Sequence, residues 1–101
     1  SDVYKRQGKD FHRIMTEQSA PLHRLAGMDI ISFGISAHDD DAYYLIRAYD
    51  SLSQLKSSQE SFYNSEEWRL GPRQAIIDRI RVSVKSVLML SNNAIDNLRS
   101  N

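Results

Sequence analysis

The sequence predicts an α+β fold in which an antiparallel sheet is covered by helices on one face. The chain has 101 residues, the size of one domain with a single core. Apolar residues recur every three or four positions in two long segments and at alternate positions in others. After a short leader, these segments follow in the order helix, strand, strand, helix, strand.

The first helix is predicted to run from near Lys9 to Ala26. Its apolar stripe has helical spacing and comprises Phe11, Ile14, Met15, Gln18, Leu22 and Leu25. Gly27 can adopt the left-handed conformation that ends a helix. Pro21 lacks a backbone donor and disfavours helical geometry at Ala20, so we expect a kink or two shorter helices.

Two strands and a hairpin are predicted next. The segment from Met28 to Ala37 is rich in strand formers, and the phase of its alternation changes near Ile30. This change indicates a bulge, although a strand buried on both faces has a similar pattern. A polar turn leads to a second strand from Ala42 to Tyr49. One face of that strand carries Tyr43, Leu45, Arg47 and Tyr49.

The second helical region begins at a capping box, because Ser51 and Gln54 have the Ser-x-x-Gln spacing. Its predicted buried stripe comprises Leu52, Leu55, Gln59 and Phe62. After a break, Ser65 can cap a further helical piece whose first turn is acidic. The buried face of this piece comprises Trp68, Pro72, Ile76 and Ile80.

A final strand is predicted from Val82 to Leu90, where apolar residues alternate, and the tail from Asn92 to Asn101 can form a short helix. The element order is that of a ferredoxin-like split βαβ fold without its opening strand. Residues 1–7 are either a non-native leader or a short substitute first strand, residues 8–91 form the α+β domain, and residues 92–101 form the tail.

Composition excludes several classes of function. Thirteen basic and thirteen acidic residues give no net charge, so a nucleic-acid or anionic-membrane partner is not expected. No apolar run reaches the ~20 residues that span a bilayer, and no secretory leader is recognisable. Without cysteine there are no disulfides, thiolate nucleophiles or sulfur-bound metals. We therefore expect a soluble cytoplasmic protein without a cofactor.

The histidines do not predict a metal site. His38 precedes three aspartates, but consecutive residues in a turn converge poorly on one ion, and such clusters are common in solvated turns. His12 and His23 are about three helical turns apart, or ~16 Å, and cannot share a metal. Both are expected at the helix surface. The sequence contains no phosphate loop, catalytic triad or zinc helix motif.

Arg47 is the most informative polar residue because it shares a strand face with aromatic residues. It either points into a cleft, where a guanidinium can hold a carboxylate ligand, or forms a structural ion pair. The partners considered for that ion pair are Asp78, Glu66 and Glu67. Trp68 is expected in the core. Tyr63 and Arg73 could close a pocket between helices and sheet.

Three segments, HDDDAYYLIRAYDS, FYNSEEWRLGPRQAI and SVLML, resemble the NIPSNAP family of the dimeric α/β barrel superfamily. The likeness covers roughly Gly8 to Leu90. The family pattern is an aromatic strand with an arginine, then Phe-Tyr, Trp and a further arginine. At its amino end the chain resembles a truncated member, because residues 1–7 are shorter and more polar than the family's opening strand.

The resemblance implies a homodimer that binds a small organic ligand in a cleft between sheet and helices. The ligand-binding residues it implies are Tyr43, Arg47, Tyr49, Tyr63, Trp68 and Arg73. Two alternatives stay open, because fold does not transfer chemistry: a cofactor-independent oxygenase or isomerase of this barrel type, and a non-enzymatic interaction module. No catalytic residue is predicted.

Overall fold

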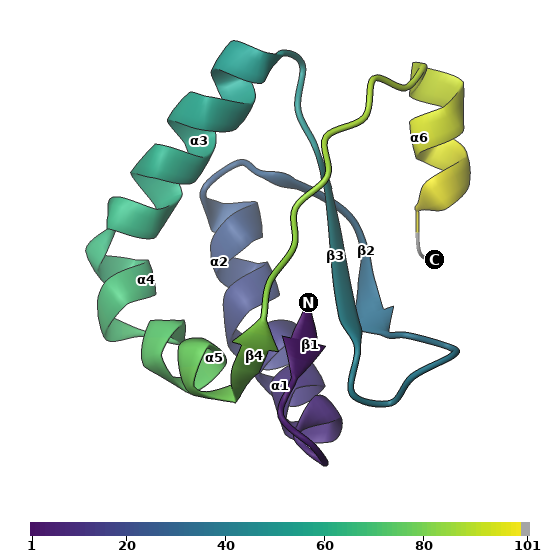
Figure 1. The fold of residues 1–101 in the computed structure, drawn as a ribbon. Coiled ribbons are helices and arrows are strands. Elements are labelled where there is room, and N and C mark those ends of the chain that lie inside the picture. The colour runs from purple at the N-terminus through teal and green to yellow at the C-terminus, as the bar shows by residue number, and fades with distance from the viewer. Residues whose placement is uncertain (100–101) are drawn as a thin grey trace.

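A computed structural model describes residues 1–99 and shows an α+β fold with small antiparallel sheets (Figure 1). Its elements are β1 (Asp2–Val3), α1 (Gly8–Ile14), the π-helix η1 (Met15–Ser19), α2 (Ala20–Leu25), β2 (Asp29–Ile35), β3 (Tyr43–Ala48), α3 (Leu52–Asn64), α4 (Glu66–Leu70), α5 (Arg73–Arg79), β4 (Ile80–Val82) and α6 (Asn92–Leu98). None of the described helices combines the length and the apolar character needed to cross a bilayer.

The first helical region is one continuous run in which a π-helix separates α1 from α2. Pro21 lies in the first turn of α2, where its missing N–H costs little, and Ala20 keeps helical angles of φ −61° and ψ −43°. The predicted interruption therefore occurs, but as a π segment before the proline. Gly27, with φ +76°, ends the run as predicted.

The π-helix changes which residues face the core. Its wider turns shift the buried stripe by about one residue relative to a regular α-helix. Leu25, predicted to be buried, is 85% exposed, whereas the neighbouring His23 is 1% exposed. The predicted surface position of His23 is therefore wrong, and the histidine becomes part of the interior.

Strands β2 and β3 form the predicted hairpin. They pair antiparallel over six residue pairs, with a register shift between Ile30 and Ser32 at the predicted bulge. The β3 residues that face the helices are buried or half-buried, whereas Tyr44 and Ile46 on the opposite face are exposed. The face predicted for Tyr43 and Arg47 is confirmed.

Helix caps define the second helical region. Ser51 accepts a hydrogen bond from the Gln54 backbone N–H at 3.0 Å, and Ser65 accepts one from the Trp68 backbone N–H at 3.3 Å. The Gln54 side chain accepts from the backbone N–H of Asp50, one residue before the expected partner. The prediction of burial fails for Leu52, which is 56% exposed because the first turn of α3 extends beyond the core.

The leader forms β1, which links the two sheets. β1 pairs antiparallel with β4, and Asp2 also forms an isolated antiparallel bridge to Ala42, beside β3. The Ser1 amino group donates to the Tyr43 carbonyl at 2.9 Å, and the Tyr43 N–H donates to the Ser1 carbonyl at 2.8 Å. β1 thus lies between β4 and the start of β3.

The predicted strand from Val82 to Leu90 is wrong beyond its first residue. β4 ends at Val82, and the chain then runs to α6 without helix, strand or turn. The alternation of apolar residues is a property of the sequence, whereas a strand also requires a hydrogen-bonding neighbour. β1 is two residues long and provides none beyond Val82. Helix α6 forms as predicted.

The core lies between the helices and the inward face of the strands. Its buried residues are Val3, Phe11, Ile14, Met15, Met28, Tyr43, Phe62, Trp68 and Ile76. Every helical region except α6 contributes to this cluster, and so does the leader, through Val3.

Val3→Ala tests whether the leader is part of the fold. Val3 is 2% exposed, so its truncation should leave a cavity and lower the free energy of unfolding by about 1–3 kcal/mol, measured by urea denaturation. Lys5→Ala is the matched control, because Lys5 is exposed two residues along the leader. Equal stability of both variants would show that β1 does not pack against the core.

Candidate functional site

Arg47 lies at the centre of a half-buried polar cluster. From the inward face of β3, its Nη1 donates to the Tyr63 hydroxyl of α3 at 2.8 Å and contacts Nε2 of His23 on α2 at 3.2 Å. A guanidinium can only donate, so Nε2 of His23 must be the acceptor. The two contacts connect the sheet to two helices.

His23 is held in the neutral form that this contact requires. Its Nδ1 donates to the Ser19 carbonyl at 2.8 Å, which leaves Nε2 without a proton. Burial lowers the pKa of His23, the Ser19 bond acts in the opposite direction, and the positive charge of Arg47 lowers it further. Because the carbonyl belongs to the last residue of η1, the π-helix positions both ends of this contact.

An aromatic group surrounds the cluster on the α3 and α4 side. The His23 ring packs on Phe62 with centroids 4.2 Å apart, and Tyr63 and Trp68 meet edge to face at 5.2 Å. The Arg47 guanidinium carbon lies 5.7 Å from the centre of the Tyr63 ring, within the range of a cation–π contact. Tyr63 therefore offers Arg47 both its hydroxyl and its ring.

None of the carboxylates of residues 1–99 forms an ion pair with Arg47. Asp78, one of the partners considered, accepts a hydrogen bond from Gln74 at 2.7 Å, and Glu66 and Glu67 are exposed on α4. The positive charge of Arg47 is thus held by neutral groups. This arrangement leaves guanidinium N–H groups available to an added anion.

The six residues of the predicted ligand site do not all meet. Arg47, Tyr63 and Trp68 belong to one cluster, and Trp68 is buried as predicted. Tyr49 instead contacts Gln59 at 3.4 Å. Arg73 is exposed at the start of α5, where no contact with a described residue holds its side chain.

Tyr43 belongs to a separate buried pair. Its hydroxyl lies 2.6 Å from Nδ1 of His12, and its ring packs edge to face on Phe11 at 4.7 Å. Burial raises the pKa of Tyr43, so the hydroxyl keeps its proton and can donate to His12. The pair fastens α1 to the start of β3 at a distance from the Arg47 cluster along the strand.

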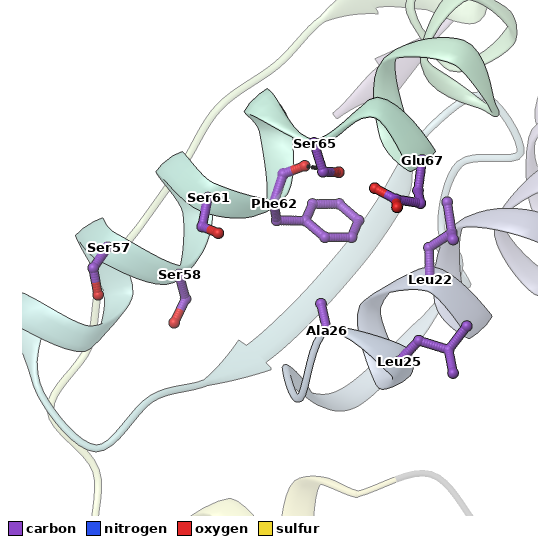
Figure 2. Close-up of a pocket in the computed structure, with 9 residues that line it drawn as sticks. All are labelled: Leu22, Leu25, Ala26, Ser57, Ser58, Ser61, Phe62, Ser65 and Glu67. Carbon is purple, nitrogen blue, oxygen red and sulfur yellow. Dashed lines mark hydrogen bonds between the residues drawn. The ribbon is translucent and has the colours of Figure 1, made fainter.

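A groove of about 630 Å³ opens between α2 and α3 (Figure 2). Serine side chains from α3, among them Ser57 and Ser61, line one side, and Leu22, Leu25 and Ala26 line the other. Phe62 projects between the two helices, and its ring also packs on His23. The groove therefore adjoins the Arg47 cluster through Phe62, although Arg47 is not among its lining residues.

Sequence reasoning missed both His23 and the groove. The serines at 57, 61 and 65 recur every four residues, which places them on one helix face and was the available signal. His23 gave no comparable signal because regular helical spacing places it outside the apolar stripe. Within the described chain, no three histidine, aspartate or glutamate side chains gather as metal ligands.

His23 should make stability depend on pH near neutrality. Its pKa is below the ordinary 6.5 only in the folded protein, so the unfolded chain binds the extra proton first. Stability should be full above pH 6.5 and fall as the pH drops through 6.5 toward the folded pKa. His23→Gln, which cannot titrate, should show a flatter dependence in thermal melts between about pH 7.5 and 5.

Asp29 does not interfere with this measurement. Its carboxylate receives two hydrogen bonds from Arg99 at 2.8 Å, which lower its pKa from 3.8, so its contribution is lost only at more acidic pH. Parallel slopes for the parent and His23→Gln would contradict the assignment of a neutral, buried His23.

No family model, curated protein or solved structure matches the chain. The NIPSNAP resemblance therefore rests on the sequence segments that carry it. Functional conclusions must come from the Arg47 cluster, its aromatic neighbours and the adjoining groove.

Proposed function

We propose that this protein is a homodimeric, small-molecule-binding protein that holds an organic acid on Arg47. The observation that carries the proposal is the pairing of Arg47 with the neutral His23 imidazole and the Tyr63 hydroxyl. A half-buried guanidinium without a carboxylate partner is poorly compensated, and a ligand carboxylate would supply the missing charge.

The geometry also supports a ligand with an apolar or aromatic body. Tyr63 and Trp68 present rings beside Arg47, and such surfaces give area and orientation while the arginine gives charge recognition. His23 and Tyr63 accept hydrogen bonds from the same Nη1, which holds the guanidinium plane in place. The remaining N–H groups are thus pre-organised for a carboxylate.

The proposed architecture is ferredoxin-like, with two copies forming a dimeric α/β barrel. The order β4, β1, β3, β2, joined by the Asp2 bridge, agrees with the antiparallel sheet of that fold. The outer sheet face exposes Tyr44 and Ile46 and supports its burial by a second copy. The NIPSNAP resemblance supports the same assembly.

The two alternatives differ in what they require of this site. A cofactor-independent enzyme of the barrel type would use the same arginine to hold its substrate, so it shares the binding step. A pure interaction module would leave Arg47 without a ligand. The exposed apolar residues of the outer face favour that module as the second candidate, because they offer surface without a pocket.

The binding proposal predicts ligand-dependent stabilisation that requires Arg47. In a thermal-shift screen of small aromatic and aliphatic acids, a ligand at 100-fold its Kd should add about 2.7 kcal/mol of stability, or several degrees in melting temperature. Arg47→Ala should weaken the binding of that ligand roughly tenfold or more, the loss of a charged hydrogen bond. Isothermal titration gives the affinities.

Arg69→Ala is the matched control because Arg69 is an exposed arginine on α4. Tyr63→Phe keeps the ring but removes the hydroxyl that positions Arg47, so it should weaken binding less than Arg47→Ala. A ligand whose stabilisation survives Arg47→Ala unchanged would remove Arg47 from the site. Stabilisation by no acid in the screen would favour the interaction module.

A further inference from the structure

The chain between β4 and α6 exposes an apolar segment without a neighbour. Residues 83–90 contain no helix or turn and run from β4 to α6 (Figure 1). No backbone group of residues 83–90 forms a hydrogen bond with the described chain. Val84 is 76%, Leu88 75% and Met89 87% exposed, so the segment combines open backbone groups with open apolar side chains.

The segment has two different faces. In an extended chain, the even positions from Val82 to Leu90 point to one side and the odd positions to the other. The Nζ of Lys85 contacts Gln59 at 3.4 Å and lies 6.0 Å from the centre of the Tyr63 ring, so the odd face is turned toward α3. The even face, which includes Val84 and Leu88, therefore points away from the helices.

The even face is complementary to itself. It comprises Val82, Val84, Ser86, Leu88 and Leu90. When two copies run antiparallel about a two-fold axis at Ser86, Val84 lies opposite Leu88 and Val82 opposite Leu90, so that each apolar residue meets another. Lys85 then lies opposite Val87, and the two lysines are kept apart.

We propose that residues 82–90 pair as an antiparallel strand with the same residues of a second copy, about a two-fold axis at Ser86. This inference rests on the homodimer of the proposed function and names the segment that forms it. β4 already uses one edge to bind β1, so the second copy occupies the opposite edge. The contact is isologous and closes as a dimer.

The buried area is sufficient for such a contact. A fully exposed valine, leucine or methionine side chain offers on the order of 100 Å² of apolar surface. The exposed residues of the segment are Val82, Val84, Val87, Leu88, Met89 and Leu90. Together they bring the total over two copies to about 1,000 Å², the lower range of specific interfaces, and added backbone hydrogen bonds fix the register.

A single cysteine tests the position of the axis, because the chain has none of its own. Ser86→Cys should place two sulfurs opposite each other, since facing residues in an antiparallel pair have Cα atoms about 4.5–5.5 Å apart, within disulfide range. Ser83→Cys is the control, because the two copies of that position lie about 20 Å apart in this register. Both serines are exposed.

The full chain is oxidised under dilute conditions, and covalent dimer is measured on non-reducing gels. Ser86→Cys should cross-link at least tenfold faster than Ser83→Cys. Equal rates for the two variants would overturn the proposed axis.

A charge exchange tests the proposed register. Val84→Lys or Leu88→Glu alone should lower dimer affinity at least tenfold, because each places a charge against an apolar residue. The double variant should recover affinity to within a few-fold of the parent, because each new lysine then faces a glutamate of the other copy. Within one extended chain the two positions are about 14 Å apart and cannot pair.

Light scattering and sedimentation separate the possible failures. A parent dimer whose double variant is as weak as the single variants overturns the strand pairing but leaves the homodimer standing. A parent that is monomeric at micromolar concentration overturns both. Ligand binding is independent of these results, because it is tested through Arg47.

Discussion

The fold depends on a strand of two residues. β1 pairs with β4 on one side and bridges to Ala42 on the other, so it connects two small sheets that no other described strand joins. Val3 from the same strand lies in the core beneath the helices. Backbone pairing and burial thus act together at one position, and the chain between β4 and α6 has no neighbour where β1 ends.

The π-helix has a comparable effect on the candidate site. By shifting the helical phase, it turns His23 inward and Leu25 outward, and its last carbonyl, that of Ser19, then holds the His23 imidazole in the tautomer that accepts from Arg47. A regular α-helix over the same residues would present an apolar side chain to the arginine. The polar cluster is therefore a consequence of backbone geometry in the helix.

The Arg47 cluster and the exposed segment share one physical feature, which is incomplete compensation. A half-buried guanidinium held by neutral groups favours an anion, and open backbone edges with apolar side chains favour another strand. Lys85 connects the two regions, because it contacts Gln59 and Tyr63 from the exposed segment. A dimer that orders this segment would also hold Lys85 beside the ring that positions Arg47.

The sequence by itself determined the local structure: the Ser51 and Ser65 caps, the hairpin with its bulge, and the inward position of Arg47 follow from periodicity and capping. Only the tertiary structure decided which residues meet. The π-helix brought His23 to Arg47, and the short β1 left residues 83–90 unpaired, although their alternation indicates a strand. Periodicity reports which side of an element is apolar, whereas pairing and contact depend on neighbours that are distant in the sequence.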